Sequence, residues 1–409
     1  MFEAFLNQNK LEFIVLTPWL FYDNYDPKSE KFIDRDTYKE LYLEVADSIR
    51  KINSGIKILG AVQSNLVSLP ENLKKSLVGL GFMSRDRTGI VVLNEQESHL
   101  IKESGYWQDS DYIITSKENL VAEIQYYSLE EGSIEISLAV IPKSNGLQEK
   151  YITEQIEFLT KEVGLDGVYL DQFNQNVHYL QRSSYGSWDG ISFDGRRKYE
   201  DTLLTTLSFQ KNILNQLSNE AIPIITNTSI ISVNDSKLNH QYFYEGFGEF
   251  HALNEWKKNS KPSSSFLVSK GHFHNPVSLG IPDWLEGDWK KDYAKALFRN
   301  LIFYLRNGSL FYHNQTFFNE PEKENLYEIY NYLFPMRPKE LGMGWILGEK
   351  KYISTVSRTF TWPNEKKPEI LIFNEEGIKN QQYFIIEKQD KGWSIELEIH
   401  DWNEVAVIL

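Results

Sequence analysis

The chain has 409 residues, and its 57 acidic side chains outnumber 43 basic ones, for a formal net charge of −14. This balance disfavours nucleic acids, polyanionic substrates and anionic membrane surfaces as partners. The chain contains no cysteine, which excludes disulfides, thiolate catalysis and cysteine-based zinc sites.

Size and composition favour a large domain followed by a small one. Hydrophobic residues make up 41% of the chain, enough for a full (β/α)8 barrel and a second core. No apolar run is long enough to predict a membrane span. Residues 1–10 lack the basic and apolar segments of a signal peptide. We therefore expect a cytoplasmic protein if this N-terminus is native, and a secreted or periplasmic one if a leader has been removed.

Strand and helix patterns alternate along residues 1–335, as in a (β/α)8 barrel. Segment 66–133 interrupts the alternation as a long excursion with short strands at 89–93 and 120–127. The predicted barrel strands are residues 11–16, 55–62, 134–141, 168–170, 222–226, 241–244, 265–268 and 309–312. The predicted helices are residues 36–52, 151–163, 199–220 and 292–307.

The pattern changes after Pro335, where short strand-like segments recur between turn signals. We expect residues 1–335 to form the barrel catalytic domain and residues 336–409 a small all-β domain, a sandwich. The sandwich is expected to pack on the barrel or to bind carbohydrate. Its predicted strands are residues 345–347, 352–356, 369–373, 382–387, 393–398 and 405–409.

The stretch 163–173 joins a helix end, a turn and a strand that stops at an acid. Asp166-Gly167 is a turn dipeptide. Residues 168–170 are an apolar run typical of a strand buried on both faces. Asp171 follows at once, and at the carboxyl end of a barrel strand it would lie on the catalytic rim. The alternative is that Asp171 caps a loop or the next helix.

Polar side chains follow nearly every predicted strand. Because the carboxyl ends of barrel strands share one rim, these side chains would gather around one cavity. Such a set suits a ligand with many hydroxyl groups. The residues are Gln63, Asn65, Asp171, Gln172, Asn227, Glu245, His272, His274, His313 and Asn314.

Asp171 and Glu245 are the two acids that directly follow apolar strands. Glycosidic cleavage needs two carboxyl groups, one to protonate the leaving oxygen and one to act as nucleophile or to activate water. Aromatic neighbours of Glu245 would desolvate it and raise its pKa, as the acid requires. A salt bridge with a barrel Arg or Lys is the alternative for Glu245. Asp189, Asp194 and Glu249 are further candidates for the acid.

Aromatic side chains near the rim are candidate stacking platforms for the apolar face of a sugar. They are Trp19, Tyr22 and Trp188, with Asp189 as a hydrogen-bonding neighbour; core packing or an ordinary loop turn is the alternative. We also expect substrate contacts from Gln63, Gln172, Asn174, Asn227, His272 and His313.

The pair His272 and His274 supports a separate hypothesis, because two histidines two residues apart on a strand point to one face. Metal hydrolases use this spacing. The pair lies after a predicted strand and not in a dense cluster of ligands. Sugar-hydroxyl contacts or a structural role are therefore the other interpretations, and we expect no metal site.

Three short motifs resemble a known group of glycosidase barrels. They are residues 164–171 (Gly-Leu-Asp-Gly-Val-Tyr-Leu-Asp), 223–227 (Pro-Ile-Ile-Thr-Asn) and Tyr244-Glu245. The chain resembles the endo-α-1,4-polygalactosaminidases and their distant relatives, the endo-α-N-acetylgalactosaminidases and the α-galactosidase clan. The resemblance implies a barrel in which Asp171 is the nucleophile or stabilising carboxylate and Glu245 the general acid/base. The loop around Trp188 is longer than in the polygalactosaminidase type.

Together these features predict a glycoside hydrolase acting on a neutral or amino-sugar oligosaccharide or polysaccharide. No metal or organic cofactor is expected. We also expect neither a nucleic-acid partner nor insertion into a membrane. One alternative is a non-catalytic, carbohydrate-binding barrel. The other is a metal-dependent hydrolase that uses His272 and His274 with Asp171.

Overall fold

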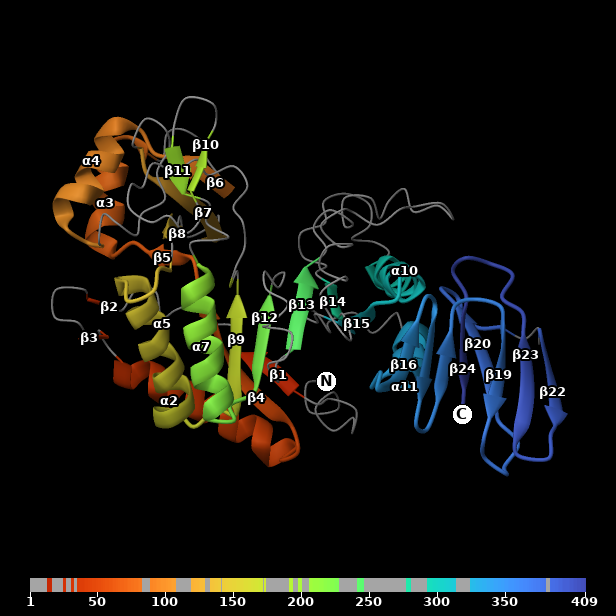
Figure 1. Ribbon diagram of the computed structural model, residues 1–409. Helices are drawn as coiled ribbons and strands as arrows, with labels where there is room; N and C mark the ends of the chain where they lie inside the picture. The colour runs from red at the N-terminus through yellow and green to blue at the C-terminus, as the bar shows by residue number, and fades with distance from the viewer. Residues whose placement is uncertain are drawn as a thin grey trace. The chain divides into compact units, whose positions relative to one another are not determined.

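The computed structural model of the protein divides into two compact units, Phe13–Gln241 and Tyr242–Leu409, and each is described by itself (Figure 1). The structure describes residues 13–16, 25–26, 31–32, 35–82, 89–107, 119–128, 133–140, 142–171, 173, 191–193, 198–200, 206–227, 241–245, 277–280, 293–313, 324–379 and 383–409.

The first unit contains a parallel sheet whose strands lie in the order β1-β4-β9-β12. Helices separate these strands along the chain, as the βα alternation predicts. The strands are β1 (Phe13–Leu16), β4 (Lys57–Gln63), β9 (Gly167–Asp171) and β12 (Ile224–Asn227). The helices are α2 (Arg35–Ile52), α5 (Leu147–Glu157) with the π-helical turn η4 (Phe158–Glu162), and α7 (Leu207–Asn219).

Glycines allow close packing around β9. A Cβ on Gly60 would lie 2.7 Å from Leu159 Cδ1, so η4 packs directly against this face of β4. A Cβ on Gly167 would lie 2.3 Å from the carbonyl oxygen of Pro223, which belongs to the chain entering β12. The Gly167 contact is with backbone, so a side chain there would push β9 away from the chain that enters β12.

Asp166 does more than form the predicted turn before β9. Its Oδ2 accepts from the backbone N–H of Ile58 at 2.9 Å, and its own N–H donates to the Ile58 carbonyl at 2.8 Å. Arg50 lies 3.6 Å from the same carboxylate and donates to the Gly164 carbonyl. These contacts tie the start of β9 to β4 and α2.

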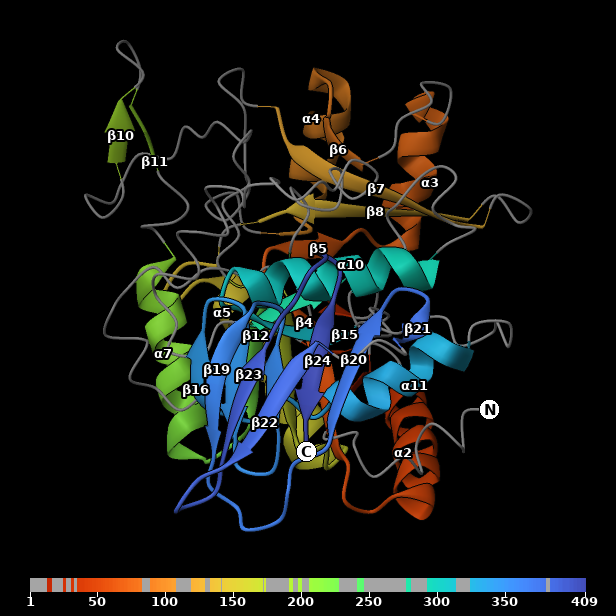
Figure 2. The same cartoon turned by 90° about the vertical axis from the view of Figure 1, so that its right-hand side faces the viewer.

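The excursion after β4 is an antiparallel sheet in the order β5-β8-β7-β6, with α3 and α4 beside it (Figure 2). Residues 134–141 were expected to be the third barrel strand, and this prediction is wrong, because β8 pairs antiparallel with β5 and β7. The elements are β5 (Leu66–Ser68), α3 (Glu71–Gly79), β6 (Gly89–Val92), α4 (Glu95–Ser104), β7 (Val121–Ser128) and β8 (Ser133–Ala139).

Two small hairpins complete the described part of the first unit. They are β2 (Tyr25–Asp26) with β3 (Lys31–Phe32), and β10 (Ile191–Phe193) with β11 (Lys198–Glu200). The helix expected at residues 199–220 therefore starts too early, since β11 occupies its first residues and α7 begins at Leu207.

The second unit begins with three parallel strands in the order β13-β14-β15. They are β13 (Gln241–Glu245), β14 (Val277–Gly280) and β15 (Leu310–His313). Along the chain, α10 (Tyr293–Arg306) lies between β14 and β15, and α11 (Glu324–Leu333) follows β15. Strand β14 was not predicted, and the strand expected at 265–268 lies outside the described residues. The closed eight-stranded barrel stays a prediction, as does the domain boundary at residue 335.

The segment after α11 is all-β, as expected. Its six-stranded sheet β16-β17-β18-β24-β20-β21 and its three-stranded sheet β19-β23-β22 share one core cluster, centred on Tyr352, Trp362 and Ile395. The two sheets thus pack face to face, which is how a sandwich is built. The strands are β16 (Pro338–Gly342), β17 (Trp345–Gly348), β18 (Tyr352–Ser354), β19 (Arg358–Trp362), β20 (Ile370–Asn374), β21 (Gly377–Ile378), β22 (Phe384–Lys388), β23 (Trp393–Leu397) and β24 (Val405–Ile408).

The sandwich is fastened to α10 and α11 (Figure 1). Arg299 of α10 makes a bidentate pair with Glu375, at 2.6 and 2.9 Å. The Lys351 ammonium donates to two carbonyls at the end of α11, both at 2.7 Å. Neither helix, nor any other that the structure describes, combines the length and apolar character needed to cross a bilayer.

Candidate functional site

The carboxyl ends of the parallel strands in the first unit carry the polar side chains that the sequence singled out. Asp171 is the last residue of β9 and is half-buried, and Gln63 is the last residue of β4. The two are register partners in adjacent parallel strands, so their side chains share one face. Asn227 ends β12 at the same edge.

The two faces of this sheet differ in what covers them. Gly60, Val62 and Leu170 share the face that packs on η4. Gln63 and Asp171 belong to the opposite face, because side chains alternate along a strand. Their functional groups therefore point away from the helical layer, as catalytic and binding groups of a barrel do.

Tyr169 lies on the same face as Asp171, two residues before it. Its hydroxyl donates to Asp171 Oδ1 at 3.4 Å, and its side chain is 7% exposed. A donor beside the carboxylate restricts the rotamer of Asp171. The sequence prediction did not include Tyr169. The signal that could have found it is its position two residues before Asp171 on the same strand, which puts both side chains on one face.

Buried amide and hydroxyl groups that have no hydrogen-bond partner among the described residues gather at the exit of β4. Gln63 and Asn65 are each 6% exposed and Ser64 is fully buried. Gln63 Oε1, Ser64 Oγ and Asn65 Oδ1 accept no hydrogen bond from any residue that the structure describes. An unsatisfied buried polar group costs about 1–3 kcal/mol, so a cluster of three indicates groups kept for a ligand or for bound water.

The backbone of residues 63–65, the β4 exit, is held by three separate parts of the unit. The Ser64 N–H donates to the Asp171 carbonyl at 3.1 Å. The Asn65 carbonyl accepts from the Val140 N–H at 2.8 Å. Gln148 of α5 donates its Nε2 to the Ser64 carbonyl at 2.9 Å. The oxygens at this exit are thus presented on a fixed backbone next to Asp171.

In the second unit, Glu245 and His313 end two strands of one parallel sheet. Glu245 is the register partner of Leu279 in β14, and His313 is the register partner of Gly280 in the same strand. Both residues therefore lie at the carboxyl edge of this sheet, as the sequence predicts. The described backbone thus gives Glu245 the strand-end position that a catalytic carboxyl needs.

Many of the predicted site residues lie outside the described residues, and their roles stay predictions. They are Trp19, Tyr22, Gln172, Asn174, Trp188, Asp189, Asp194, Glu249, His272, His274 and Asn314. Among the residues that are described, no group of three or more His, Asp or Glu side chains could hold a metal ion.

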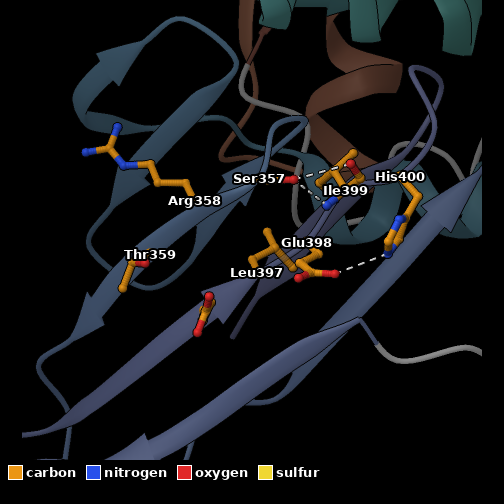
Figure 3. Close-up of a pocket in the computed structure, with 8 residues that line it drawn as sticks. Ser357, Arg358, Thr359, Leu397, Glu398, Ile399 and His400 are labelled. Carbon is orange, nitrogen blue, oxygen red and sulfur yellow. Dashed lines mark hydrogen bonds and ion pairs between the residues drawn. The ribbon is translucent and has the colours of Figure 1, made fainter.

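A concave surface lies on the sandwich, over β19 and the end of β23 (Figure 3). Two pairs of its lining residues are bonded to one another. The Ser357 hydroxyl accepts from the Ile399 N–H at 2.8 Å, and Glu398 pairs with His400 at 3.4 Å. The Arg358 guanidinium stacks on the Trp345 ring at 3.9 Å. The β4 exit differs in holding three buried oxygens that have no partner in the described part of the chain, which makes the strand-end edge the stronger candidate.

Comparisons with known proteins do not place the chain in a family. No protein-family model matches it, and no curated protein does. It is similar to an α-amylase from H. orenii, 12% identical with a TM-score of 0.41 over 97% of this chain and 88% of the other. A debranching enzyme from Nostoc punctiforme is 10% identical with a TM-score of 0.45 over 100% and 87%.

A cyclic α-maltosyl-(1→6)-maltose hydrolase from Arthrobacter globiformis, in complex with maltose, gives the same TM-score of 0.45 at 10% identity, over 100% of this chain and 88% of the other. None of these three is a polygalactosaminidase, an α-N-acetylgalactosaminidase or an α-galactosidase, the families that the sequence motifs resemble. Likenesses at these identities and TM-scores carry no conclusion about the function of this chain.

Proposed function

We propose that the chain is a glycoside hydrolase that cleaves an O-glycosidic bond in a neutral or amino-sugar oligosaccharide or polysaccharide. The observation that carries the proposal is the edge formed by Asp171 and Gln63. A half-buried carboxylate ends a buried parallel strand, and a buried amide oxygen on the same face beside it has no partner among the described residues. Few settings other than a ligand site keep such a pair.

The chemistry of the groups at this edge limits the substrate. Amide oxygens and a carboxylate accept hydrogen bonds, so they suit the hydroxyl groups of a sugar or the ammonium of an amino sugar. A chain with a net charge of −14 repels a uronic acid or a sulfated sugar. The proposed substrate is therefore uncharged or cationic, and no metal or organic cofactor is required.

In the proposed mechanism Asp171 and Glu245 are the two carboxyl groups that glycosidic cleavage needs. Asp171 acts as nucleophile or stabilises the positive charge that develops on the sugar, with Tyr169 as its hydrogen-bonding neighbour. Glu245 protonates the leaving oxygen. The alternative residues for this role are Asp189 and Glu249. His313 and Asn227 contact sugar hydroxyl groups, each from the end of its own strand.

The test is a screen against a panel of neutral, amino-sugar and uronic-acid glycans, with detection of new reducing ends. We expect turnover of a neutral or amino-sugar glycan, lost in Asp171→Asn and in Glu245→Gln while Glu398→Gln on the sandwich keeps full activity. Turnover that survives Asp171→Asn would overturn the assignment of Asp171.

The oxygens of Gln63 and Asn65, which no described residue bonds, equally favour a second function, a barrel that binds carbohydrate without cleaving it. The two functions differ in one measurement. If wild-type protein binds a glycan by calorimetry but releases no reducing ends, and Asp171→Asn binds equally well, the chain is a carbohydrate-binding protein.

A further inference from the structure

Ser64 connects the proposed catalytic strand to helix α5 through the two peptide groups that flank its Cα. Its N–H donates to the carbonyl of Asp171 at 3.1 Å, and its carbonyl accepts from Gln148 Nε2 at 2.9 Å. Both Ser64 and Gln148 are fully buried. Gln148 therefore holds the Ser64–Asn65 peptide, and the adjoining Gln63–Ser64 peptide holds the end of β9.

We propose that Gln148 is a positioning residue, which fixes the β4 exit and through it the reactive carboxylate of Asp171. The inference rests on the proposed function. Gln148 belongs to the first turn of α5, 84 residues along the chain from Ser64. No side chain at the exit itself bonds the Ser64 carbonyl in the described structure, so the exit takes its orientation from this helix.

A buried amide hydrogen bond of this kind is directional, whereas apolar packing is not. Loss of the bond frees the Ser64–Asn65 peptide to rotate about the Ser64 Cα. The adjoining Gln63–Ser64 peptide, which bonds the Asp171 carbonyl, shifts with it and displaces Asp171 and Gln63. Displacing a catalytic group by about 1 Å costs roughly 100-fold in rate. Sequence alone gives no signal for Gln148, because nothing in its neighbourhood resembles a motif.

The chain offers a matched control in Gln155. It lies on α5 two turns after Gln148, is 1% exposed, and its Nε2 has no partner within the described chain. Gln148→Leu and Gln155→Leu therefore remove the same group from the same helix at the same depth. Only the first removes a bond to the β4 exit.

The experiment compares kcat and KM of the two leucine variants on the glycan that the wild type cleaves. We expect Gln148→Leu to lower kcat about 10- to 100-fold with KM nearly unchanged, and Gln155→Leu to behave as wild type. Amide hydrogen exchange of the peptide covering residues 60–66 is expected to speed up in Gln148→Leu alone. Equal kcat values in the two variants, or losses that only follow the melting temperature, would overturn the inference.

Gln148→Glu supplies a second readout that does not depend on the leucine variant folding. A protonated, buried carboxyl donates to the Ser64 carbonyl, whereas the ionised form repels it. Activity of Gln148→Glu is therefore expected at acid pH and lost as pH rises, relative to wild type, and a profile parallel to wild type would contradict the inference. A wild-type chain without turnover on any glycan would instead overturn the proposed function itself.

Discussion

Gln63 buries an amide oxygen beside Asp171 that no described residue satisfies. Folding alone would favour an apolar side chain here, since desolvating the amide costs free energy that no contact among the described residues returns. Keeping the amide therefore makes sense if a ligand supplies the missing donor.

Replacing Gln63 by Met keeps the length of the side chain and removes the acceptor. We expect KM to rise about fivefold, the value of one neutral hydrogen bond, with the melting temperature unchanged or higher. Thr226→Val is the control, because Thr226 is fully buried, its hydroxyl has no partner in the described chain, and it lies on the helix-facing side of β12. An unchanged KM in Gln63→Met would mean that the amide does not contact the substrate.

The position of Asp171 is predictable from sequence because a short apolar run between a turn and an acid has few interpretations. The roles of its neighbours are not. Asp166 reads as an ordinary turn residue, yet its carboxylate bonds the Ile58 N–H and pairs with Arg50. Those contacts join segments more than 100 residues apart, and only the folded chain reveals them.

At the level of elements, β9 depends on the absence of a side chain at its first residue. A Cβ on Gly167 would meet the Pro223 carbonyl at 2.3 Å, a contact that only a backbone shift can relieve. We expect Gly167→Ala to destabilise the chain by on the order of 2 kcal/mol, measured by urea denaturation.

Gly79→Ala is the control for Gly167→Ala, since a Cβ at the end of α3 meets nothing within 4 Å. It is expected to be neutral or slightly stabilising, because alanine has the higher helix propensity. Equal stabilities for the two alanine variants would show that β9 and β12 are not packed as described.

Strand β8 shows why the barrel order could not be taken from sequence alone. Its length and apolar content fit a barrel strand, but apolar and polar residues alternate within it. Ile136 and Leu138 are fully buried, and Ser137 between them is half-buried. Such alternation is typical of a sheet with one solvated face, and the pairing with β5 and β7 agrees with it.

In the second unit, the carboxylate of Glu404 links the turn at residues 400–401 to Lys379, which follows β21. Glu404 is fully buried, pairs with Lys379 and accepts from the backbone N–H groups of His400 and Asp401 at 3.0 and 3.2 Å. Burial raises the pKa of Glu404, but the bonds to Lys379 and to the two N–H groups outweigh it. The net result is a pKa below the ordinary value of 4.5.

A carboxyl whose pKa is lowered by folding stabilises the protein above its unfolded pKa, and this contribution is lost as pH falls through the folded pKa. Glu404→Gln is thus expected to cost about 3 kcal/mol of unfolding free energy at pH 7, and much less in acid below its folded pKa. Glu398→Gln, which changes an exposed carboxylate of the same sandwich, is the control. A cost of Glu404→Gln that does not change with pH would contradict the account.

We propose that Asp171 and Glu245, 74 positions apart in the sequence, act in one reaction. Each is placed at the carboxyl end of a parallel strand in its own unit. Groups that serve one chemical step lose their contributions together, whereas groups in separate sites lose them independently.

The most direct test is a double-mutant cycle on kcat/KM with Asp171→Asn, Glu245→Gln and the double variant, on the glycan found in the screen. If each single change costs about 1000-fold, the account predicts that the double variant is hardly slower than the slower single variant. Losses that multiply in the double variant, or a Glu245→Gln enzyme as fast as wild type, would contradict it.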